Sequence, residues 1–543
     1  MSWTRRRWYA LSLVLLVLGA VVLSFAFRPD RDVAGTPAAG DPAATSTAPT
    51  TSGSVPESAP GGATITVPSS ESPSFTFPDP GTMPGPPPDV EPDGAVGAGS
   101  GGDPYYPEAG NGGYDVTAYA VSLVFDPDSG RMQATTVIEA TVTEPTRLGR
   151  FSLDLQPTMT VTQVLIGDTP AGFDQQEAKL TVTPVGGLEP GSKVRATVTY
   201  EGTPGPIVGD VSGSGDGGWF ALDSGGAVVI GEPFSASAWY PVNEIPTDRA
   251  TFRVDAQVPT GWKVISNGVP DTAAEVPPSA PGLDRFRWVE TSEMASYLST
   301  IYIDTFTQSQ DTTTGGLPVI NAYAKGQESD REVADRTGEF VDFLASRFGP
   351  YPFGSTGGIY LADSFGFALE TQTRPVYSGG MGGESTVVHE LAHQWFGDAV
   401  TVERWADICL NECFASYAEW LWAENKGTDL DERYRQAVAT ARNLPSFWQS
   451  PLYDMGAGNE FGSVYTRGPL ALHALRAELG DEKFDELLLS WIEEHSGKSA
   501  SWADFESLVT TIAGTDETPF LQAWFHSTTI PADEFLYPGD LNP

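Results

Sequence analysis

Two histidines four residues apart constrain this chain more than any other feature of its sequence. They lie in the segment His-Glu-Leu-Ala-His at residues 389–393. In a helix this spacing places both imidazoles on one face, about one turn apart, so His389 and His393 can direct nitrogens at one metal ion. Glu390 lies about a quarter-turn around the helix, where it can hold a water molecule beside the metal. Glu412 follows 19 residues after His393. Two histidines and a glutamate with an open fourth position form the usual ligand set of hydrolytic zinc sites, so we predict one Zn²⁺ per chain.

The five-residue motif alone also fits a surface helix that carries two solvated histidines. The surrounding residues favour a buried helix instead, because they are nearly all apolar apart from Gln394. A second apolar segment begins at Glu412 and continues to Leu421. Buried polar groups need partners, and a metal ion would supply one for all three side chains. The context therefore favours a metal site.

The metal motif extends into two longer patterns, His-Glu-x-x-His-x-Trp-Phe-Gly at residues 389–397 and Leu-Asn-Glu-x-Phe-Ala at residues 410–415. Together they resemble the zinc aminopeptidase family that includes aminopeptidase N. The resemblance spans roughly residues 113–530. It implies that the two histidines and Glu412 bind zinc and that Glu390 is the general base of peptide hydrolysis.

Two further segments resemble the parts of this family that bind the free amino group of the substrate. Phe-Ala-Leu-Glu-Thr at residues 367–371 is similar to the family's Gly-Ala-Met-Glu-Asn exopeptidase motif. This implies that Glu370 binds the α-amino group and that Ala368 lies in the substrate site. Glu232, followed by Pro233, resembles a second glutamate that contacts the same amine.

The segment Val-Tyr-Thr-Arg-Gly at residues 464–468 resembles the family's Tyr-x-Lys-Gly sequence. The resemblance implies that Tyr465 stabilises the oxyanion of the tetrahedral intermediate. Arg467 stands in place of the lysine and keeps its charge but not its geometry.

These residues predict a zinc-dependent aminopeptidase that hydrolyses the N-terminal peptide bond of peptides with a free N-terminus. Phe367, Leu369 and Thr371 replace three residues of the family's exopeptidase motif. A zinc endopeptidase with a thermolysin-like site is therefore one alternative, and a non-catalytic peptide-binding surface protein is another. The intact set of metal, base and oxyanion residues disfavours the second.

The N-terminus predicts export. Three arginines at residues 5–7 precede an apolar stretch that runs from Trp8 to Phe27. About twenty apolar residues can span a bilayer, and the arginines place the N-terminus in the cytoplasm. We therefore expect a signal anchor over residues 1–28, with single-pass attachment to the cell membrane and an extracytoplasmic catalytic domain. A cleaved signal peptide, which would make the enzyme secreted, is the alternative.

Composition divides the rest of the chain into three regions. Residues 29–112 are rich in Pro, Gly, Ser and Thr and predict a disordered linker. Alternating β-branched and aromatic residues over 113–310 predict an antiparallel β domain, which resembles the family's saddle-shaped N-terminal domain. Helical patterns over 311–543 predict a mostly helical domain, and the resemblance implies that it is a thermolysin-like catalytic domain. The expected fold class is thus α+β and multidomain, in a compact bacterial form without the large helical C-terminal domain of many family members.

Cys409 and Cys413 are the only two cysteines of the chain, and they stand where the family usually has Trp and Gly. An exported protein meets an oxidising environment, so we predict a disulfide between them. Positions four apart in a regular helix hold their Cβ atoms too far apart for an easy bond. The prediction therefore requires a helix that begins near Asn411. Two buried free thiols and adventitious metal binding are the alternatives.

The chain is strongly acidic, with 71 Asp and Glu residues against 30 Lys and Arg residues and a net charge of −41. This acidity favours solubility outside the cytoplasm or in a salt-adapted organism, and it would also attract cationic peptide N-termini. No basic patch interrupts it, so nucleic acid is not an expected partner.

Overall fold

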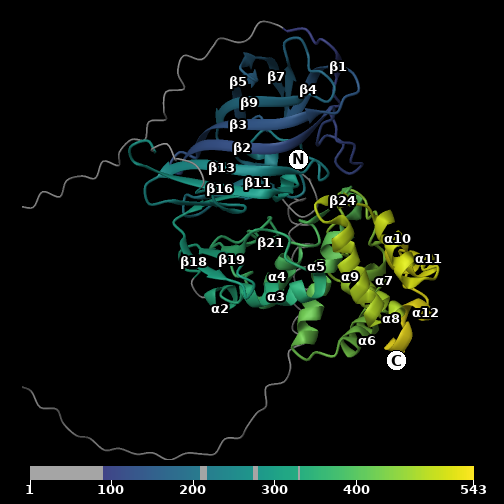
Figure 1. Ribbon diagram of the computed structural model, residues 1–543. Helices are drawn as coiled ribbons and strands as arrows, with labels where there is room; N and C mark the ends of the chain where they lie inside the picture. The colour runs from purple at the N-terminus through teal and green to yellow at the C-terminus, as the bar shows by residue number, and fades with distance from the viewer. Residues whose placement is uncertain (1–89, 208–216, 273–278, 328–329, 543) are drawn as a thin grey trace, which may run out of the picture. The chain divides into compact units, whose positions relative to one another are not determined.

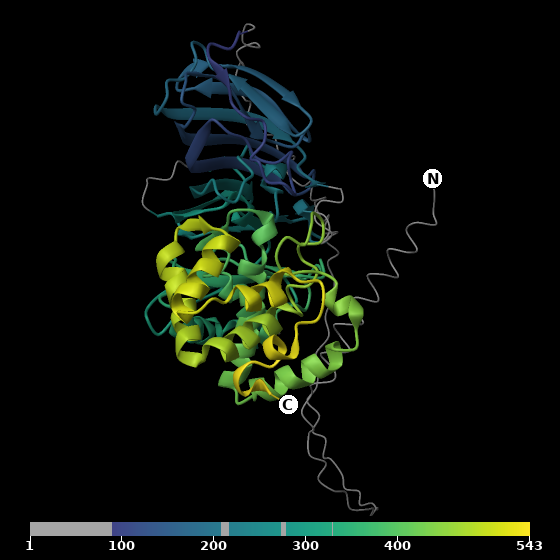
Figure 2. The ribbon, with the colours of Figure 1, turned by 90° about the vertical axis from the view of Figure 1, so that its right-hand side faces the viewer.

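The computed structural model describes residues 90–207, 217–272, 279–327 and 330–542 (Figures 1 and 2). The signal anchor predicted over residues 1–28 lies outside these ranges, as does the predicted linker up to residue 89. Among the described residues, none of the helices combines the length and the apolar character that crossing a membrane requires.

The β-rich part begins with an eight-stranded sheet in the order β15-β16-β13-β2-β3-β9-β5-β6. Buried and more exposed side chains alternate along β3, as expected for a sheet with one face in the core. The strand patterns predicted in this region are confirmed by β2 and β9. The strands are β2 (Tyr114–Asp126), β3 (Arg131–Val142), β5 (Met159–Ile166), β6 (Thr169–Pro170), β9 (Lys193–Gly202), β13 (Ala250–Pro259), β15 (Val269–Pro270) and β16 (Leu283–Met294).

The sheet is mixed, so the expectation of a wholly antiparallel domain is wrong in one place. β13 runs parallel to β2, pairing from Thr251 with Ala118 to Gln257 with Val124. A parallel pair needs a long connection to return the chain to the same end of the sheet. Here the chain passes through all the strands from β3 to β12 before it returns as β13.

Two smaller sheets complete the β-rich part, with orders β1-β4-β8-β7 and β10-β11-β12-β17-β14. All four residues of β12 are buried, and the chain then turns at Gly231 to reach Glu232. A Cβ atom at residue 231 would lie 2.1 Å from the carbonyl oxygen of Tyr297, so only glycine fits this turn. The strands are β1 (Ala95–Val96), β4 (Leu148–Asp154), β7 (Gly172–Gln176), β8 (Lys179–Thr183), β10 (Pro206–Ile207), β11 (Gly217–Ala221), β12 (Ala227–Ile230), β14 (Lys263–Ser266) and β17 (Ile301–Asp304).

The C-terminal boundary predicted for the linker, residue 112, is wrong, because residues within 90–112 form hydrogen bonds with the folded chain. β1 pairs with β4. Asp103 Oδ2 accepts a hydrogen bond from the backbone nitrogen of Trp405 at 2.9 Å. The Tyr105 hydroxyl donates to Asp454 Oδ1 at 2.7 Å. A few side chains with specific partners order this segment, although its average composition resembles that of a linker.

The C-terminal part combines a five-stranded sheet, β18-β19-β20-β22-β21, with most of the helices (Figure 1). The sequence did not predict this sheet, because its strands after residue 317 are short and lie between helical segments. Its strands are β18 (Thr307–Thr312), β19 (Pro318–Tyr323), β20 (Thr356–Tyr360), β21 (Ala368–Leu369) and β22 (Val376–Tyr377). A parallel pair, β23 (Val400–Val402) and β24 (Lys498–Ala500), lies apart from it.

The helices begin and end where local chemistry dictates. Ser501 and Asp504 form a capping box at the start of α10. Gly480 ends α8 with a positive φ of 82°. Figure 2 shows the C-terminal helices gathered in one group. The α-helices are α2 (Arg331–Ala334), α3 (Thr337–Phe348), α4 (Glu384–Ala392), α5 (Cys409–Asn425), α6 (Leu430–Ala441), α7 (Pro445–Trp448), α8 (Gly468–Leu479), α9 (Asp481–His495), α10 (Trp502–Ala513), α11 (Thr518–Leu521) and α12 (Asp533–Leu536).

The loop after β21 connects the two parts of the chain through buried hydrogen bonds. Asn267 Nδ2 donates to the carbonyl oxygen of Gln372 at 2.8 Å, and Gly268 N donates to Thr373 Oγ1 at 2.7 Å. Arg374 Nη2 donates to the carbonyl oxygen of Gly268 at 2.6 Å. The β-rich part therefore fixes the position of a loop that begins at Glu370.

Candidate active site

Helices α4 and α5 bring the three predicted metal ligands together. His389 lies within α4, His393 is the C-cap residue of that helix, and Glu412 lies in the first turn of α5. Their exposed fractions are 8 %, 1 % and 3 %. This burial contradicts the alternative of a surface helix with solvated histidines.

The ligand atoms lie at distances that suit one metal ion. His389 Nε2 is 3.2 Å from Glu412 Oε2, and His393 Nε2 is 3.4 Å from the same oxygen. One ligand atom from each of the three residues falls within 4.8 Å of the others. A tetrahedral zinc ion with bonds of about 2.0–2.1 Å places its ligand atoms about 3.3–3.4 Å apart. Two imidazoles and one carboxylate at this spacing therefore fit Zn²⁺.

The other nitrogen of each imidazole has its own partner. His389 Nδ1 lies 3.0 Å from Glu419 Oε1, and His393 Nδ1 lies 3.0 Å from the carbonyl oxygen of Phe396. Both partners accept hydrogen bonds, so they favour a proton on Nδ1 and a free lone pair on Nε2, toward the metal position. Glu419 was not predicted. Its spacing of seven residues from Glu412, about two turns of α5, could have indicated it.

Burial and the neighbouring histidines shift the pKa values of the site's carboxyl groups in opposite directions. Burial raises the pKa of Glu390 to about 8, against the opposing effect of the two histidines. Burial would also raise the pKa of Glu412, but His393 and His389 outweigh it and hold that pKa below its usual range. A bound dication would lower the pKa of Glu390 in turn, because it stabilises a nearby carboxylate.

Glu370 and Glu232 come from different parts of the chain to the same site. Ligand atoms of Glu370, Glu390 and His393 lie within 4.8 Å of one another. Burial raises the pKa of Glu232 well above its usual range, and the charge of Glu370 is the next largest cause. Burial likewise raises the pKa of Glu370. Ala368 is half-buried in β21, two residues before Glu370.

One carboxylate oxygen of each of these two residues has no partner. Glu232 Oε1 and Glu370 Oε1 are buried and form no hydrogen bond within the part of the chain that the structure describes. Buried acceptors without partners are costly. A cationic ligand with several N–H donors would satisfy both.

Tyr465 lies beside the metal ligands, just before α8. Its hydroxyl donates to Glu412 Oε1 at 3.2 Å, and its ring centroid is 6.0 Å from that of His389. The residue is 44 % exposed, but its hydroxyl points to buried carboxylates. Burial of that end and the charge of Glu412 raise the pKa of Tyr465, so the hydroxyl stays protonated and can donate.

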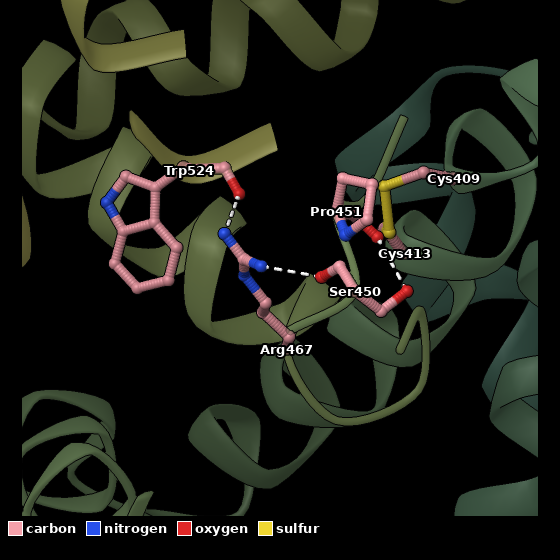
Figure 3. The surroundings of a disulfide bond; sticks show 6 residues. All are labelled: Cys409, Cys413, Ser450, Pro451, Arg467 and Trp524. Atoms are coloured by element: carbon pink, nitrogen blue, oxygen red, sulfur yellow. Dashed lines mark hydrogen bonds between the residues drawn. A yellow bond between two sulfur atoms is a disulfide. The ribbon is translucent and has the colours of Figure 1, made fainter. Parts of the chain in front are cut away.

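Cys409 and Cys413 form a disulfide, with their Cα atoms 4.8 Å apart (Figure 3). The helix begins at Cys409 rather than near Asn411, so the bridge spans the first turn of α5. The expectation of a later helix start is therefore wrong. This Cα separation is nevertheless within the range of disulfides, because the first turn brings the two residues close enough. A Cβ atom at Gly468 would lie 2.6 Å from Cys413 Sγ, so the start of α8 packs directly against the bridge.

Arg467 is fully buried between Tyr465 and α8. Its guanidinium donates to four backbone carbonyl groups, those of Trp448, Ser450, Trp524 and Ser527. Figure 3 shows the bonds to Ser450 and Trp524. A lysine could not match this planar set of donors. Arg467 therefore joins the segment that carries Tyr465 to the C-terminal ends of α7 and of the helical turn Gln522–His526.

We expect the protein exported by its native host to hold no free thiol. Thiol labelling under denaturing conditions, followed by mass spectrometry, should find no label without reductant and two labels with it. The bridge encloses a very short loop, so chain-entropy arithmetic gives it about 2 kcal/mol of stabilisation. Labelling of Cys409 and Cys413 before reduction would contradict the bridge.

Comparison with known proteins places this site in a family. Residues 381–524 match the model of the peptidase family M1 domain. Aminopeptidase N of Canis lupus familiaris is 27% identical over 302 residues, which are 49% of this chain and 30% of that protein. Aminopeptidase N of Streptomyces lividans is 25% identical over 325 residues, which are 53% of this chain and 36% of that protein. The chain thus spans about a third of the length of these curated relatives.

Solved structures match over a larger share. A variant of an M1 zinc metallopeptidase from Deinococcus radiodurans, bound to Tyr-Ser-Ala, is 30% identical with a TM-score of 0.72. The match covers 80% of this chain and 99% of that one. A two-domain M1 zinc metallopeptidase variant bound to L-arginine has a TM-score of 0.73, 29% identity and the same coverage. With a β-rich N-terminal part, a helical C-terminal part and a matching metal motif, this chain belongs to the M1 family of zinc metallopeptidases.

Proposed function

We propose that this protein is a zinc-dependent aminopeptidase that hydrolyses the N-terminal peptide bond of peptides. The observation that carries this proposal is the pair of buried, unpartnered oxygens on Glu232 and Glu370 beside the metal ligands. A substrate ammonium group offers three donors and one positive charge, which match two carboxylates. This pair distinguishes an exopeptidase from an endopeptidase that has the same metal ligands.

The ligand set is proposed to be His389, His393 and Glu412. Bound zinc supplies a Lewis acid that polarises the scissile carbonyl and lowers the pKa of water. Glu390 takes the proton of the attacking water and then passes it to the leaving amine. The hydroxyl of Tyr465 donates a hydrogen bond to the oxyanion as the tetrahedral intermediate forms.

Glu232 and Glu370 hold the ammonium group and so place the first peptide bond at the metal. The ligands named for the solved relatives, L-arginine and Tyr-Ser-Ala, each carry a free amino group. We propose the same class of ligand here. Ala368, two residues before Glu370, would line the pocket for the first side chain.

Glu370→Ala is expected to lower kcat/KM for aminoacyl-coumarin substrates by about 10- to 100-fold, mainly through KM, because a hydrogen bond to a charged group contributes about 1.5–3 kcal/mol. Steady-state kinetics of the zinc-loaded protein measure this effect. Glu244→Ala is the matched control, since Glu244 is also buried but accepts a hydrogen bond from the backbone nitrogen of Ser237 and is not among the grouped ligand atoms. An unchanged KM in Glu370→Ala would argue against amine binding by this residue.

A comparison of free and N-acetylated peptides tests the function itself. The wild-type protein should cleave the free peptides and leave the acetylated ones intact. Equal cleavage of both would indicate the endopeptidase alternative, and no cleavage of either by zinc-loaded protein would indicate a non-catalytic role.

We also propose that the enzyme is exported and held at the cell membrane with its catalytic part outside. The three arginines and the apolar stretch that follows them support this location. We assign the β-rich part to the family's saddle-shaped N-terminal domain, and the position of Glu232 in this part supports the assignment. Fractionation of native cells tests the location, since a soluble, shortened protein in the medium would indicate a cleaved signal peptide.

A further inference from the structure

Gln394, which directly follows His393, links the metal helix to the loop that carries Glu370. It is fully buried. Its Nε2 donates to the carbonyl oxygen of Glu370 at 3.0 Å, and its Oε1 accepts from the backbone nitrogen of Thr373 at 2.8 Å. One planar amide therefore holds both ends of the turn from 370 to 373.

The far side of the same turn is fixed by other groups. Thr373 has a φ of 66°, which a residue with a β-branched side chain seldom adopts. Its Oγ1 accepts from Gly268 N, and Arg374 Nη1 donates to the carbonyl oxygen of Thr356 at 2.9 Å. The backbone at Glu370 is thus held between the β-rich part and Gln394.

We propose that Gln394 is a positioning residue that sets the distance between the Glu370 carboxylate and the metal ligands. This inference rests on the proposed aminopeptidase function. His393 and Gln394 are neighbours in sequence, so any movement of the metal ligand is transmitted to the Glu370 backbone. In the proposed aminopeptidase the ammonium site and the metal must lie one residue apart, so this distance decides whether the first peptide bond reaches the metal.

The chemistry of the amide explains why this position needs glutamine. The turn offers an acceptor at Glu370 and a donor at Thr373, so the side chain must supply one donor and one acceptor. Methionine has a similar length and supplies neither of them in effective form. A buried glutamate would be protonated and could supply both a donor and an acceptor, so it does not test the amide. A misplacement of about 1 Å at a catalytic site can cost about 100-fold in rate.

The test compares Gln394→Met with Tyr351→Phe. The Tyr351 hydroxyl donates to the same Oε1 atom at 3.2 Å, so its loss perturbs the amide without removing the bonds to the turn. Zinc content, KM and kcat are measured for an alanyl-coumarin substrate, together with the ratio of cleavage rates for a free and an N-acetylated peptide.

Gln394→Met should keep one zinc per chain, raise KM about 10- to 100-fold and lower the preference for the free peptide by a similar factor. Tyr351→Phe should change that preference less than about threefold, because it removes a single neutral hydrogen bond and leaves both bonds to the turn in place. A purely structural role would lower the melting temperature in both variants and leave the preference intact. That outcome, or loss of zinc in Gln394→Met, would overturn the proposal.

If Gln394→Met does not fold, Gln394→Leu serves in its place, because leucine supplies neither donor nor acceptor, and it too should weaken the preference for the free peptide. An unchanged preference in a folded Gln394→Leu protein would also overturn the proposal. The wild-type ratio is measured first. A wild-type protein without preference for free peptides contradicts the proposed function itself, whereas an unchanged preference in the variants contradicts only the role of Gln394.

Discussion

Glu390→Gln is expected to retain one zinc per chain and to lose turnover by about 10²- to 10⁴-fold. The substitution removes the base but none of the three metal ligands, and general acid–base catalysis contributes a factor of this size. Glutamine has nearly the same shape, so the buried helix α4 should remain packed. Elemental analysis and steady-state kinetics of the same preparation measure both quantities.

Glu384→Gln is the matched control, because Glu384 lies in the first turn of α4 and bonds Trp422 Nε1 at 2.8 Å, away from the metal ligands. It should keep near wild-type turnover. Loss of zinc in Glu390→Gln would show that this residue is a ligand, and full activity would remove it from the mechanism.

Tyr465→Phe should lower kcat by about 10²- to 10³-fold, with little change in KM. Removal of one donor to a developing oxyanion has this cost in comparable sites, and the ground-state substrate does not require the bond. Zinc content should not change, because the phenol is not among the proposed ligands.

Tyr453→Phe provides the comparison for Tyr465→Phe. Tyr453 lies earlier in the same loop, between α7 and α8, and stacks on Trp502 with ring centroids 5.6 Å apart. If kcat of Tyr465→Phe stays within about threefold of the wild-type value, Tyr465 is not the oxyanion donor.

The two histidine ligands could be predicted from the sequence because residues four apart in a helix point in the same direction. His389 and His393 had to share a face, and the apolar residues around them indicated burial. Glu232, Glu370 and Tyr465 depended on resemblance, because a lone glutamate or tyrosine does not indicate its partner. The structure brings all of them to the metal ligands, and their catalytic roles stay predictions.

Other features of the site required tertiary information. Glu419 lies in α5 and Gln394 directly after α4, each among apolar residues, and the sequence does not show which buried atoms they face. The disulfide was predicted, but the helix start was misplaced, because a first turn tolerates a bridge that a mid-helix position would not. The short strands from β19 to β22 were missed because they lie between helical segments, and β20 pairs with β19 across the helices α2 and α3.

The contacts of residues 90–112 change where the catalytic unit begins. Asp103 bonds the backbone at Trp405, four residues before α5, and Tyr105 bonds the loop that leads towards Tyr465. A fragment that starts at residue 113 would therefore retain every strand of the large sheet and every proposed catalytic side chain. It would lose the hydrogen bonds of Asp103 and Tyr105 to the segments that precede Glu412 and Tyr465. A fragment that keeps both contacts must start before Asp103, inside a stretch whose composition resembles a spacer.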